Sequence, residues 1–418
     1  MRSLQPTREQ RKGSLERIEM YAQLAILAAF VFLYSITAGR IERSVFSGPM
    51  IFVTAGVIVG PVLGWFPGVA TGSELRLMAD FALALFLFVD AANANLSVLR
   101  RSFGIPSRML LIGLPGAVLL GFGLALVMFD ALTIYEAAVL GAMLAATDAA
   151  LGKPVITNPS VPFQLREGLN VESGLNDGLC VPIVLAFIAL ELGTEQGLGS
   201  GLAITLIAEE LGIGALVGLG VTAIGTGLFR LCQRLGWVTD VWIQITIVAL
   251  AIACFGLAQS LHGSGYIATF TGGALFGYFS KRETHALVHP AEGIGETLAL
   301  LTWLMFGIVV IEQVYAQLTW QVLVFALLSL TVVRMVPIYI SLVGSGEPAS
   351  SRLFLGWFGP RGLASIVFTV IVLDEGLPGA RLIALVVACT VTMSLVLHGL
   401  TANPLAGWIA GKCPSSNK

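Results

Sequence analysis

Long runs of apolar residues, separated by short polar connections, make up most of the chain. The runs are roughly 17–25 residues long, which lets a helix cross a hydrocarbon core of about 30 Å. The pattern predicts about 13 transmembrane helices and therefore an all-α polytopic membrane protein. The predicted spans are about 20–38, 47–64, 76–97, 108–129, 134–151, 162–192, 201–231, 239–261, 264–280, 293–313, 318–343, 352–374 and 379–410.

Composition supports this class. Hydrophobic residues form 56% of the chain and charged residues 11%, whereas soluble domains carry about 25% charged residues. The 48 glycines allow helices to approach one another closely in lipid. A net charge of −2 without basic clusters gives no sign of nucleic acid, so membrane lipid is the expected partner. The five cysteines show no metal-ligand spacing, and no cofactor is expected.

Two spans at equivalent places in the chain contain residues that interrupt helices. The fifth span carries Thr147 and Asp148, followed by Gly152 and Pro154, and the twelfth carries the run Gly359-Pro360-Arg361-Gly362. These positions correspond if spans 1–6 repeat as spans 8–13. Matched interruptions indicate an inverted-repeat transporter with a site near the membrane midplane. The alternative is an ordinary kink in each span.

The predicted organisation is one membrane domain with short polar ends. Its units are a polar N-terminal tail over 1–19, a single transmembrane domain over 20–410 and a short C-terminal tail over 411–418. Within the domain, repeat one covers about 20–192, a linking helix about 201–231 and repeat two about 239–410.

Lys and Arg residues concentrate in the connections on one side of the predicted membrane. Fourteen lie on that side and two on the other, which predicts a cytoplasmic C-terminus. Thirteen spans then place the N-terminus outside, although the N-terminal tail also carries several basic residues.

Four polar side chains lie within six residues of the sixth span, in the stretch Gly168–Pro182. On a helix, Glu172 lies four residues before Asn176. Ser173 lies likewise before Asp177, so the two pairs form adjacent stripes of one face. Polar groups in apolar surroundings need a partner, a proton or an ion. Asp177 has no basic residue within a helical turn, so we expect it to hold a proton or a cation.

Other buried ionisable residues suggest ligands and partners. A helix broken at Asp148 leaves free carbonyls that bind a cation, and the carboxylate completes an oxygen cage. Ser173 can offer its hydroxyl to the same cation. Arg334, deep in the eleventh span, keeps its charge and needs an anion, for which Glu172 is the natural partner.

The remaining polar residues have supporting or interfacial interpretations. Asn176 is expected to orient Asp177 or cap a broken segment, and Arg361 to neutralise the helix ends where the twelfth span breaks. Asp90 is interpreted as an accessory ligand, a cytoplasm-facing gate or a polar residue at a funnel surface. Asp80 and Glu136 are assigned to interfacial positions near span ends. The four histidines, also near span ends, are assigned to solvated positions: His262, His285, His289 and His398.

These motifs resemble the monovalent cation:proton antiporter-1 family, the electroneutral sodium/proton antiporters that include NhaP- and NHE-like proteins. The matching residues are Ala146-Thr147-Asp148, Glu172-Ser173-Gly174-Leu175-Asn176-Asp177-Gly178, Arg334 and Gly359-Pro360-Arg361-Gly362. The resemblance extends from Met20 to about Trp408. Asp90 stands where the family often has Glu, and Pro360 where it usually has Leu.

The resemblance implies an NhaA-like antiporter fold, with a dimerisation domain and a core domain that contains two crossed broken helices. It implies that Asp177 binds both ion and proton, with Thr147, Asp148 and Ser173 near a bound Na⁺. Glu172 and Arg334 would form a structural ion pair. It also implies homodimers and the exchange of one Na⁺, Li⁺ or K⁺ for one proton. The short chain is typical of a prokaryotic inner-membrane protein.

The expected function is secondary active antiport by alternating access, with a place in pH homeostasis, and not enzymatic catalysis. A single titrating carboxylate beside Asn176 favours electroneutral 1:1 exchange. A cation channel and an organic-anion symporter on a similar scaffold are the alternatives. Single, asymmetric charged groups disfavour the channel, and buried Asp148 and Asp177 disfavour an anion. A hydrolase using Ser173 lacks a His or Lys at depth to activate it.

Overall fold

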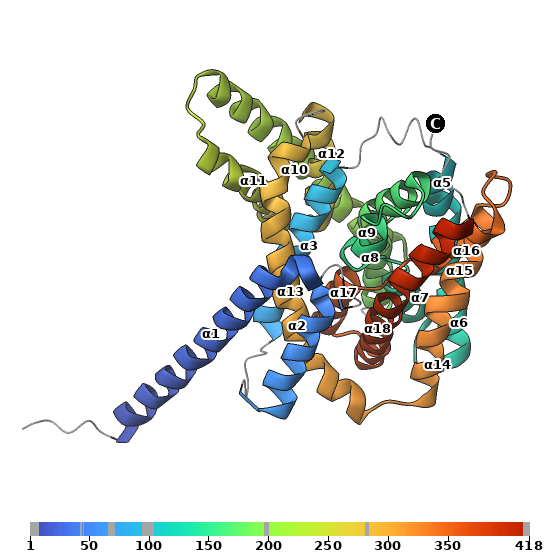
Figure 1. Ribbon diagram of the computed structural model, residues 1–418, viewed down its shortest axis with the longest axis horizontal. Coiled ribbons are helices and arrows are strands. Elements are labelled where there is room, and N and C mark those ends of the chain that lie inside the picture. The colour runs from blue at the N-terminus through green and yellow to red at the C-terminus, as the bar shows by residue number, and fades with distance from the viewer. Residues whose placement is uncertain are drawn as a thin grey trace, which may run out of the picture.

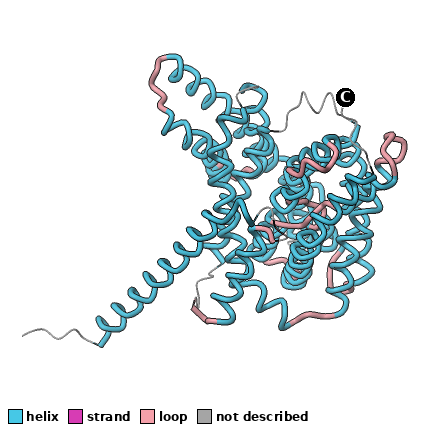
Figure 2. Tube along the Cα trace, viewed as in Figure 1, coloured by secondary structure: helices cyan, strands magenta, loops and turns pink. Residues whose placement is uncertain are grey.

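Helices account for almost all of the described structure. The computed structural model describes residues 8–41, 44, 46–65, 72–93, 104–195, 200–280 and 284–412, and no strand occurs in them (Figure 2). The first helices are α1 (Arg8–Ile41), α2 (Gly48–Val57), α3 (Gly72–Asn93), α5 (Gly104–Arg108), α6 (Leu114–Met128), α7 (Ile134–Met143), α8 (Ala149–Ile156) and α9 (Phe163–Glu195). The others are α10 (Ser200–Arg234), α11 (Asp240–Ser260), α12 (Gly265–Ser280), α13 (Thr284–Ala316), α14 (Trp320–Leu328), α15 (Arg334–Ser341), α16 (Ala349–Trp357), α17 (Leu363–Asp374) and α18 (Ala380–Lys412). Short π-helical turns at Ile58–Val62, Met109–Gly113 and Ser329–Val333 continue α2, α5 and α14.

Within the described residues, the helices correspond to the thirteen predicted spans. The fifth span consists of α7 and α8, and the twelfth of α16 and α17, each pair joined by an irregular link. The all-helical class and the two interrupted helices are therefore confirmed. The boundaries of the two repeats stay a prediction. Parts of the predicted tails, residues 1–7 and 413–418, lie outside the described residues.

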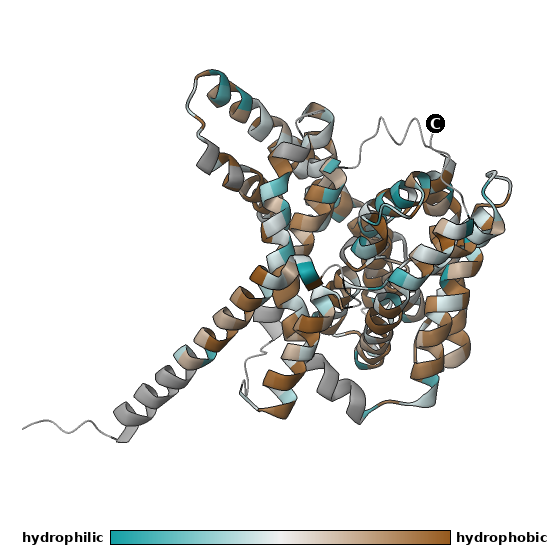
Figure 3. Ribbon diagram, viewed as in Figure 1, coloured by the Kyte–Doolittle hydropathy of each residue, from teal (hydrophilic) through white to brown (hydrophobic). Residues whose placement is uncertain are grey.

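The outward faces of the helices are apolar. Seven described helices are long and apolar enough to cross a membrane by length and composition, and four shorter apolar segments accompany them. Leu111, Val127 and Leu216 are 70%, 81% and 72% exposed although they are large hydrophobic residues. Figure 3 shows apolar positions along the outer surfaces of many helices. Lipid solvates such surfaces, whereas water does so unfavourably.

The helices form two groups that lie side by side (Figure 1). In the first group, which contains α1–α3 and α10–α13, α3 packs on α12 and α13, and α2 packs on α13. The second group contains α5–α9 and α14–α18. Its members pack on one another, as α7 does on α9 and α17 on α18, while α3 contacts both α9 and α17 across the junction.

Ion pairs connect the two groups at separate places along their junction. Arg76 of α3 pairs with Asp374 at the end of α17. Lys153 of α8 lies 2.8 Å from a carboxylate oxygen of Glu296 in α13. Both pairs are partly exposed to solvent.

Two acidic residues assigned to the interface are buried instead. Asp80 is 7% exposed and accepts a hydrogen bond of 2.5 Å from the Tyr266 hydroxyl. Glu136 is fully buried, forms a capping box with Thr133 at the start of α7 and accepts the Gly379 N–H. Neighbouring helices thus supply the hydrogen-bond partners that water would otherwise provide.

The backbones of α2 and α13 meet at Gly56 and Gly307. A Cβ atom built on Gly56 would lie 3.0 Å from the Gly307 Cα, and one on Gly307 would lie 3.1 Å from the Gly56 Cα. Both distances are shorter than ordinary van der Waals contact. The first helix group therefore depends on small residues at this place.

We expect Gly307→Leu to push α13 away from α2 and to lower the free energy of unfolding by about 1–3 kcal/mol, because overpacking has costs of this size. Thermal unfolding in detergent measures the effect. Gly123→Leu in α6 is the control, since no heavy atom lies within 4 Å of a Cβ built there. Equal unfolding temperatures for the two variants would contradict the expectation.

Candidate functional site

The irregular links of the two interrupted helices contact each other. The links are residues 144–148, between α7 and α8, and residues 358–362, between α16 and α17. The Asp148 N–H donates to the Pro360 carbonyl at 2.8 Å, and the Leu363 N–H donates to Asp148 Oδ2 at 2.8 Å. This contact between the two links is termed the crossing.

Asp148 lies at the N-termini of two helices. Its Oδ1 accepts the Leu151 N–H of α8 at 3.2 Å, while its Oδ2 accepts the N–H of Leu363, the first residue of α17. Helix N-termini carry unsatisfied N–H groups and a partial positive charge, so both ends stabilise this carboxylate. Asp148 is 8% exposed.

Arg361 lies at the opposite kind of helix end. It is fully buried, and its Nη1 donates to the Ala145 and Ala146 carbonyls at 3.0 and 3.1 Å. These carbonyls follow the C-terminus of α7, where a cation is favourable. Arg361 was expected to neutralise helix ends in its own span; the structure places it at the end of the fifth span instead, because the two links cross.

Glu172 and Asn176 of α9 both have several hydrogen-bond partners. Arg334 donates from Nη1 and Nη2 to the two oxygens of Glu172, at 2.8 and 3.0 Å, and neither residue is more than 1% exposed. The Asn176 amide nitrogen lies 3.0 Å from Glu172 Oε1, 3.0 Å from Thr147 Oγ1 and 3.1 Å from the Ala145 carbonyl. Asn176 therefore connects the buried ion pair to the crossing.

Asp177 has fewer hydrogen-bond partners than the other carboxylates at the crossing. Its side chain is half-buried, and its Oδ1 is buried with no hydrogen-bond partner among the described residues. It lies against the Thr147 N–H, and Asp148, Asp90 and Glu172 are the carboxylates that repel its negative charge. Thr147 Oγ1 and Ser173 Oγ lie 3.2 Å apart, and both residues are buried.

Asp90 approaches the site from the first helix group. A Cβ built on Gly174 of α9 would lie 3.5 Å from the Asp90 Cβ, so Asp90 of α3 faces α9 one turn before Asp177. It is half-buried. The structure thus brings Thr147, Asp148, Glu172, Ser173, Asn176, Asp177, Arg334 and Arg361 to one region, with Asp90 at its border.

Two glycines of the second link have no room for a side chain. A Cβ on Gly362 would lie 2.5 Å from Asp148 Cγ, and a Cβ on Gly359 would lie 2.7 Å from Arg334 Cζ. These glycines allow the link to approach the carboxylate on one side and the ion pair on the other.

Sequence reasoning missed three side chains of the crossing. The Ser365 hydroxyl donates to the Met143 carbonyl at 2.9 Å, and Ser394 Oγ accepts the Arg361 N–H at 2.7 Å. His398, expected to be solvated, is 3% exposed and contacts Ser394, whereas His262 and His289 are exposed and the His285 side chain lies outside the described residues. The i,i+4 spacing of Ser394 and His398 was the signal available in the sequence.

The donor set is made of oxygens. Carboxylates and hydroxyls suit hard cations, in contrast to the thiolate and imidazole ligands of zinc or copper. The described residues contain no group of three or more His, Cys, Asp or Glu side chains suited to a metal ion.

Comparisons with known proteins bear on this arrangement. The family model described as "Sodium/hydrogen exchanger, transmembrane" matches residues 26–408. The K(+)/H(+) antiporter NhaP of Alkalimonas amylolytica is 25% identical over 297 residues, 71% of this chain and 51% of that protein. The K(+)/H(+) antiporter NhaP2 of Shewanella oneidensis is 23% identical over 386 residues, 91% of this chain and 65% of that protein. The chain thus spans between about half and two thirds of the length of these relatives.

Solved structures show the same architecture. The structure at pH 8 of MjNhaP1, a sodium proton antiporter from Methanocaldococcus jannaschii, has a TM-score of 0.73 at 20% identity, covering 94% of this chain and 100% of that chain. A second structure of MjNhaP1, from an EM map, has a TM-score of 0.75 at 19% identity. The predicted antiporter fold is confirmed by this likeness. Because the family model covers most of its length, the chain belongs to the transmembrane sodium/hydrogen exchanger family.

Proposed function

We propose that this protein exchanges a monovalent cation for a proton across a membrane and that both bind in turn to Asp177. The observation that carries the proposal is the buried Asp177 Oδ1, which has no hydrogen-bond partner among the described residues. A buried carboxylate oxygen needs a counter-ion or a proton. The other acidic residue of this α9 face, Glu172, is fully occupied by Arg334.

Three further residues supply oxygen ligands beside Asp177. The Thr147 and Ser173 hydroxyls lie 3.2 Å apart, and each oxygen has lone pairs for a cation. The Asp148 carboxylate, whose oxygens accept the Leu151 and Leu363 N–H groups, is the third of these residues. Na⁺, Li⁺ and K⁺ are the substrates that fit this chemistry, and the named relatives include antiporters for K⁺.

Exchange follows from competition at one carboxylate. A cation displaces the proton from Asp177 on one side of the membrane, and a proton displaces the cation on the other. Between these events the second helix group, which carries the crossing, moves against the first. The partly exposed pairs Arg76–Asp374 and Lys153–Glu296 join the two groups, so this motion rearranges them.

The formal charges at the crossing favour 1:1 exchange. Within the crossing itself, without Asp90 at its border, Asp148, Glu172 and Asp177 contribute three negative charges, and Arg334 and Arg361 contribute two positive charges. The resulting charge of −1 is neutralised by one monovalent cation or by one proton. Neutrality in both loaded states avoids moving net charge through a medium of low dielectric constant.

The supporting residues have separate tasks in this scheme. Glu172 and Arg334 form a structural ion pair. Asn176 joins that pair to Thr147 without adding a charge, and Arg361 stabilises the end of α7. Asp90 guides cations toward Asp177 from the first helix group.

The cellular setting is a prokaryotic inner membrane, with a cytoplasmic C-terminus and a place in pH homeostasis. We further propose a homodimer formed through the first helix group. The apolar stretch Tyr21–Ile41 of α1 supports this, since none of its residues is fully buried within the protomer. Bacterial relatives and the bias of Lys and Arg between the predicted connections support the membrane and the orientation.

Asp177→Asn tests the proposed function. It keeps the shape of the side chain but removes the charge that binds the cation and the proton. We expect cation-driven proton flux in proteoliposomes to fall by at least about 100-fold, since even the outer partners of ion ligands contribute 10–100-fold. Asp130→Asn, at an exposed position between α6 and α7, should leave the flux unchanged. An active Asp177→Asn variant would exclude Asp177 as the exchanging group.

A double-mutant cycle tests the structural ion pair. Glu172→Gln and Arg334→Met each leave one buried charge unpaired, so each should lower the free energy of unfolding by about 3–5 kcal/mol. The double variant carries neither charge and should recover most of the loss. Unfolding in detergent measures all three variants. Single variants as stable as the unmodified protein would refute the role.

Membrane potential tests the stoichiometry. In electroneutral exchange, the cation and proton gradients at which flux reverses should not change when about 100 mV is imposed across the vesicle membrane. One net charge per cycle would be worth about 2.3 kcal/mol at that potential. The reversal point would then move by roughly 50-fold in the gradient ratio, and that shift would reject 1:1 exchange.

A further inference from the structure

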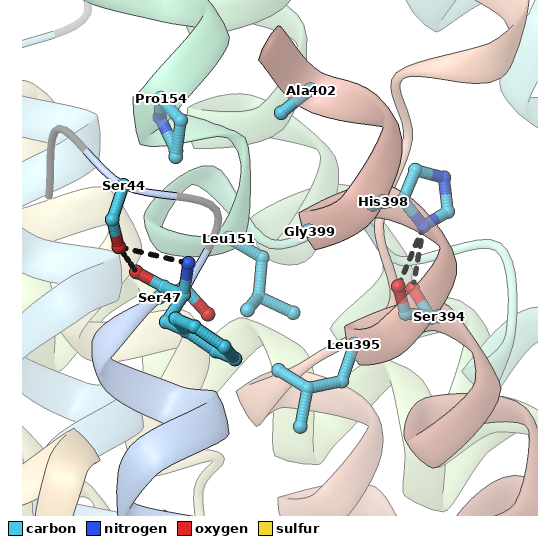
Figure 4. A pocket seen from close by; sticks show the side chains of 10 residues that line it. Ser44, Ser47, Leu151, Pro154, Ser394, Leu395, His398, Gly399 and Ala402 are labelled. Atoms are coloured by element: carbon cyan, nitrogen blue, oxygen red, sulfur yellow. Dashed lines mark hydrogen bonds between the residues drawn. The ribbon is translucent and has the colours of Figure 1, made fainter. Parts of the chain in front are cut away.

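The imidazole of His398 in α18 is buried and has polar partners at both ring nitrogens. The residue is 3% exposed. Its Nε2 lies 2.9 Å from the Trp357 carbonyl at the end of α16, and its Nδ1 lies 3.1 Å from Ser394 Oγ and 2.9 Å from the Ser394 carbonyl. Figure 4 shows the ring beside Ser394, and both residues are among those that line a small cavity, as is Leu151.

The hydrogen bonds place a proton on Nε2 of the ring. The Trp357 carbonyl only accepts, so Nε2 donates to it. Ser394 Oγ accepts the Arg361 N–H, and in the neutral ring its own hydrogen can point toward Nδ1. This tautomer satisfies the Trp357 carbonyl and the Ser394 hydroxyl but gives no hydrogen bond to the Ser394 carbonyl, which lies 2.9 Å from Nδ1.

Through these hydrogen bonds α18 contacts the second link at two places. His398 holds Trp357, which precedes the link, and Ser394 holds Arg361 within it. The Thr401 hydroxyl of the same helix accepts the Trp357 indole N–H at 2.9 Å. Residues next to Arg361 position Asp148: the Pro360 carbonyl of the link accepts its N–H, and the N–H of Leu363, the first residue of α17, donates to its carboxylate.

The side of Asp148 that faces α8 is also backed by α18. Leu151, whose N–H donates to Asp148 Oδ1, lines the cavity together with Ser394, Leu395 and His398 of α18 (Figure 4). Helix α18 thus adjoins both interrupted helices near Asp148: it makes hydrogen bonds to the second link, and it packs on α8.

We propose that His398 and Ser394 are positioning residues of the transport site. They fix the link over residues 358–362, and that link sets the place of the Asp148 carboxylate. This inference rests on the proposed function, because it assigns Asp148 to the cation. Among the described residues, Arg361 and Arg334 are the charged side chains that act electrostatically on His398. The role requires the ring as a hydrogen-bonding group and not as a group that changes charge.

Two amide substitutions at position 398 distinguish the loss of the hydrogen bond from the loss of the ring's volume. In His398→Gln the amide nitrogen takes the place of Nε2 and can donate to the Trp357 carbonyl. In His398→Asn the amide reaches only the place of Nδ1. We expect His398→Asn and Ser394→Ala to raise the cation KM of antiport by about three- to tenfold, the value of one lost hydrogen bond. His398→Gln should restore a KM within about twofold of the unmodified protein and keep its pH profile.

Thr390→Val is the matched control in α18. Thr390 is fully buried like its neighbours, but its hydroxyl donates only to the Val386 carbonyl of its own helix. We expect its cation KM to be unchanged. A general packing defect would instead lower the maximal rate or the unfolding temperature of all the variants alike.

Two results would overturn the inference. One is an unchanged KM in His398→Asn and Ser394→Ala while the unmodified protein is active. The other is a shifted pH profile in His398→Gln, which would make His398 a titrating group. Failure of the proposed function is a separate outcome, since the unmodified protein would then show no cation-dependent proton flux.

Discussion

Each interrupted helix stabilises the other through a charged side chain. A break inside an apolar protein exposes N–H and C=O groups that neither lipid nor helix can satisfy. Asp148, in the first link, accepts the N–H of Leu363 at the start of α17, in addition to that of Leu151. Arg361, in the second link, donates to carbonyls that follow α7. Because the two charges serve each other's helix ends, neither break is stable without the other, and the position of Asp148 depends on both.

The neighbouring residues of α9 differ in how much of their hydrogen-bonding capacity is in use. Glu172 and Asn176 are saturated by Arg334 and by the crossing, so they act as fixed parts of the core. Asp177 follows Asn176 directly, yet one of its oxygens is left without a partner. The uninterrupted helix α9 thus carries one carboxylate that is paired and one with an unpartnered oxygen, five residues or about 1.4 turns apart. In a medium of low dielectric constant this difference has a large electrostatic effect, because the Glu172 charge is neutralised by Arg334 whereas the Asp177 charge has no such partner within the described structure.

Much of this arrangement could be predicted from the sequence, because lipid imposes simple constraints. Span length and the low content of charge revealed the helices, and the helix breakers around Asp148 and Pro360 revealed the interruptions. The prediction failed where partners come from distant segments. Nothing in the local pattern shows that Arg361 serves α7, that Glu136 accepts the Gly379 N–H or that His398 is buried under Trp357. Those pairings are tertiary, and spacing along one helix does not contain them.

The shape of the second link limits which residues evolution can place there. Gly359 is closed by the Arg334 guanidinium and Gly362 by the Asp148 carboxylate, so even alanine would displace a charged group. Arg361 is held by the carbonyls it serves. Position 360 is different, because its hydrogen bond uses its carbonyl, which every amino acid provides, although the residue is buried. The one place where this chain departs from the family's usual glycine-rich link, Pro360 for Leu, therefore keeps the hydrogen bond that the link gives to the Asp148 N–H.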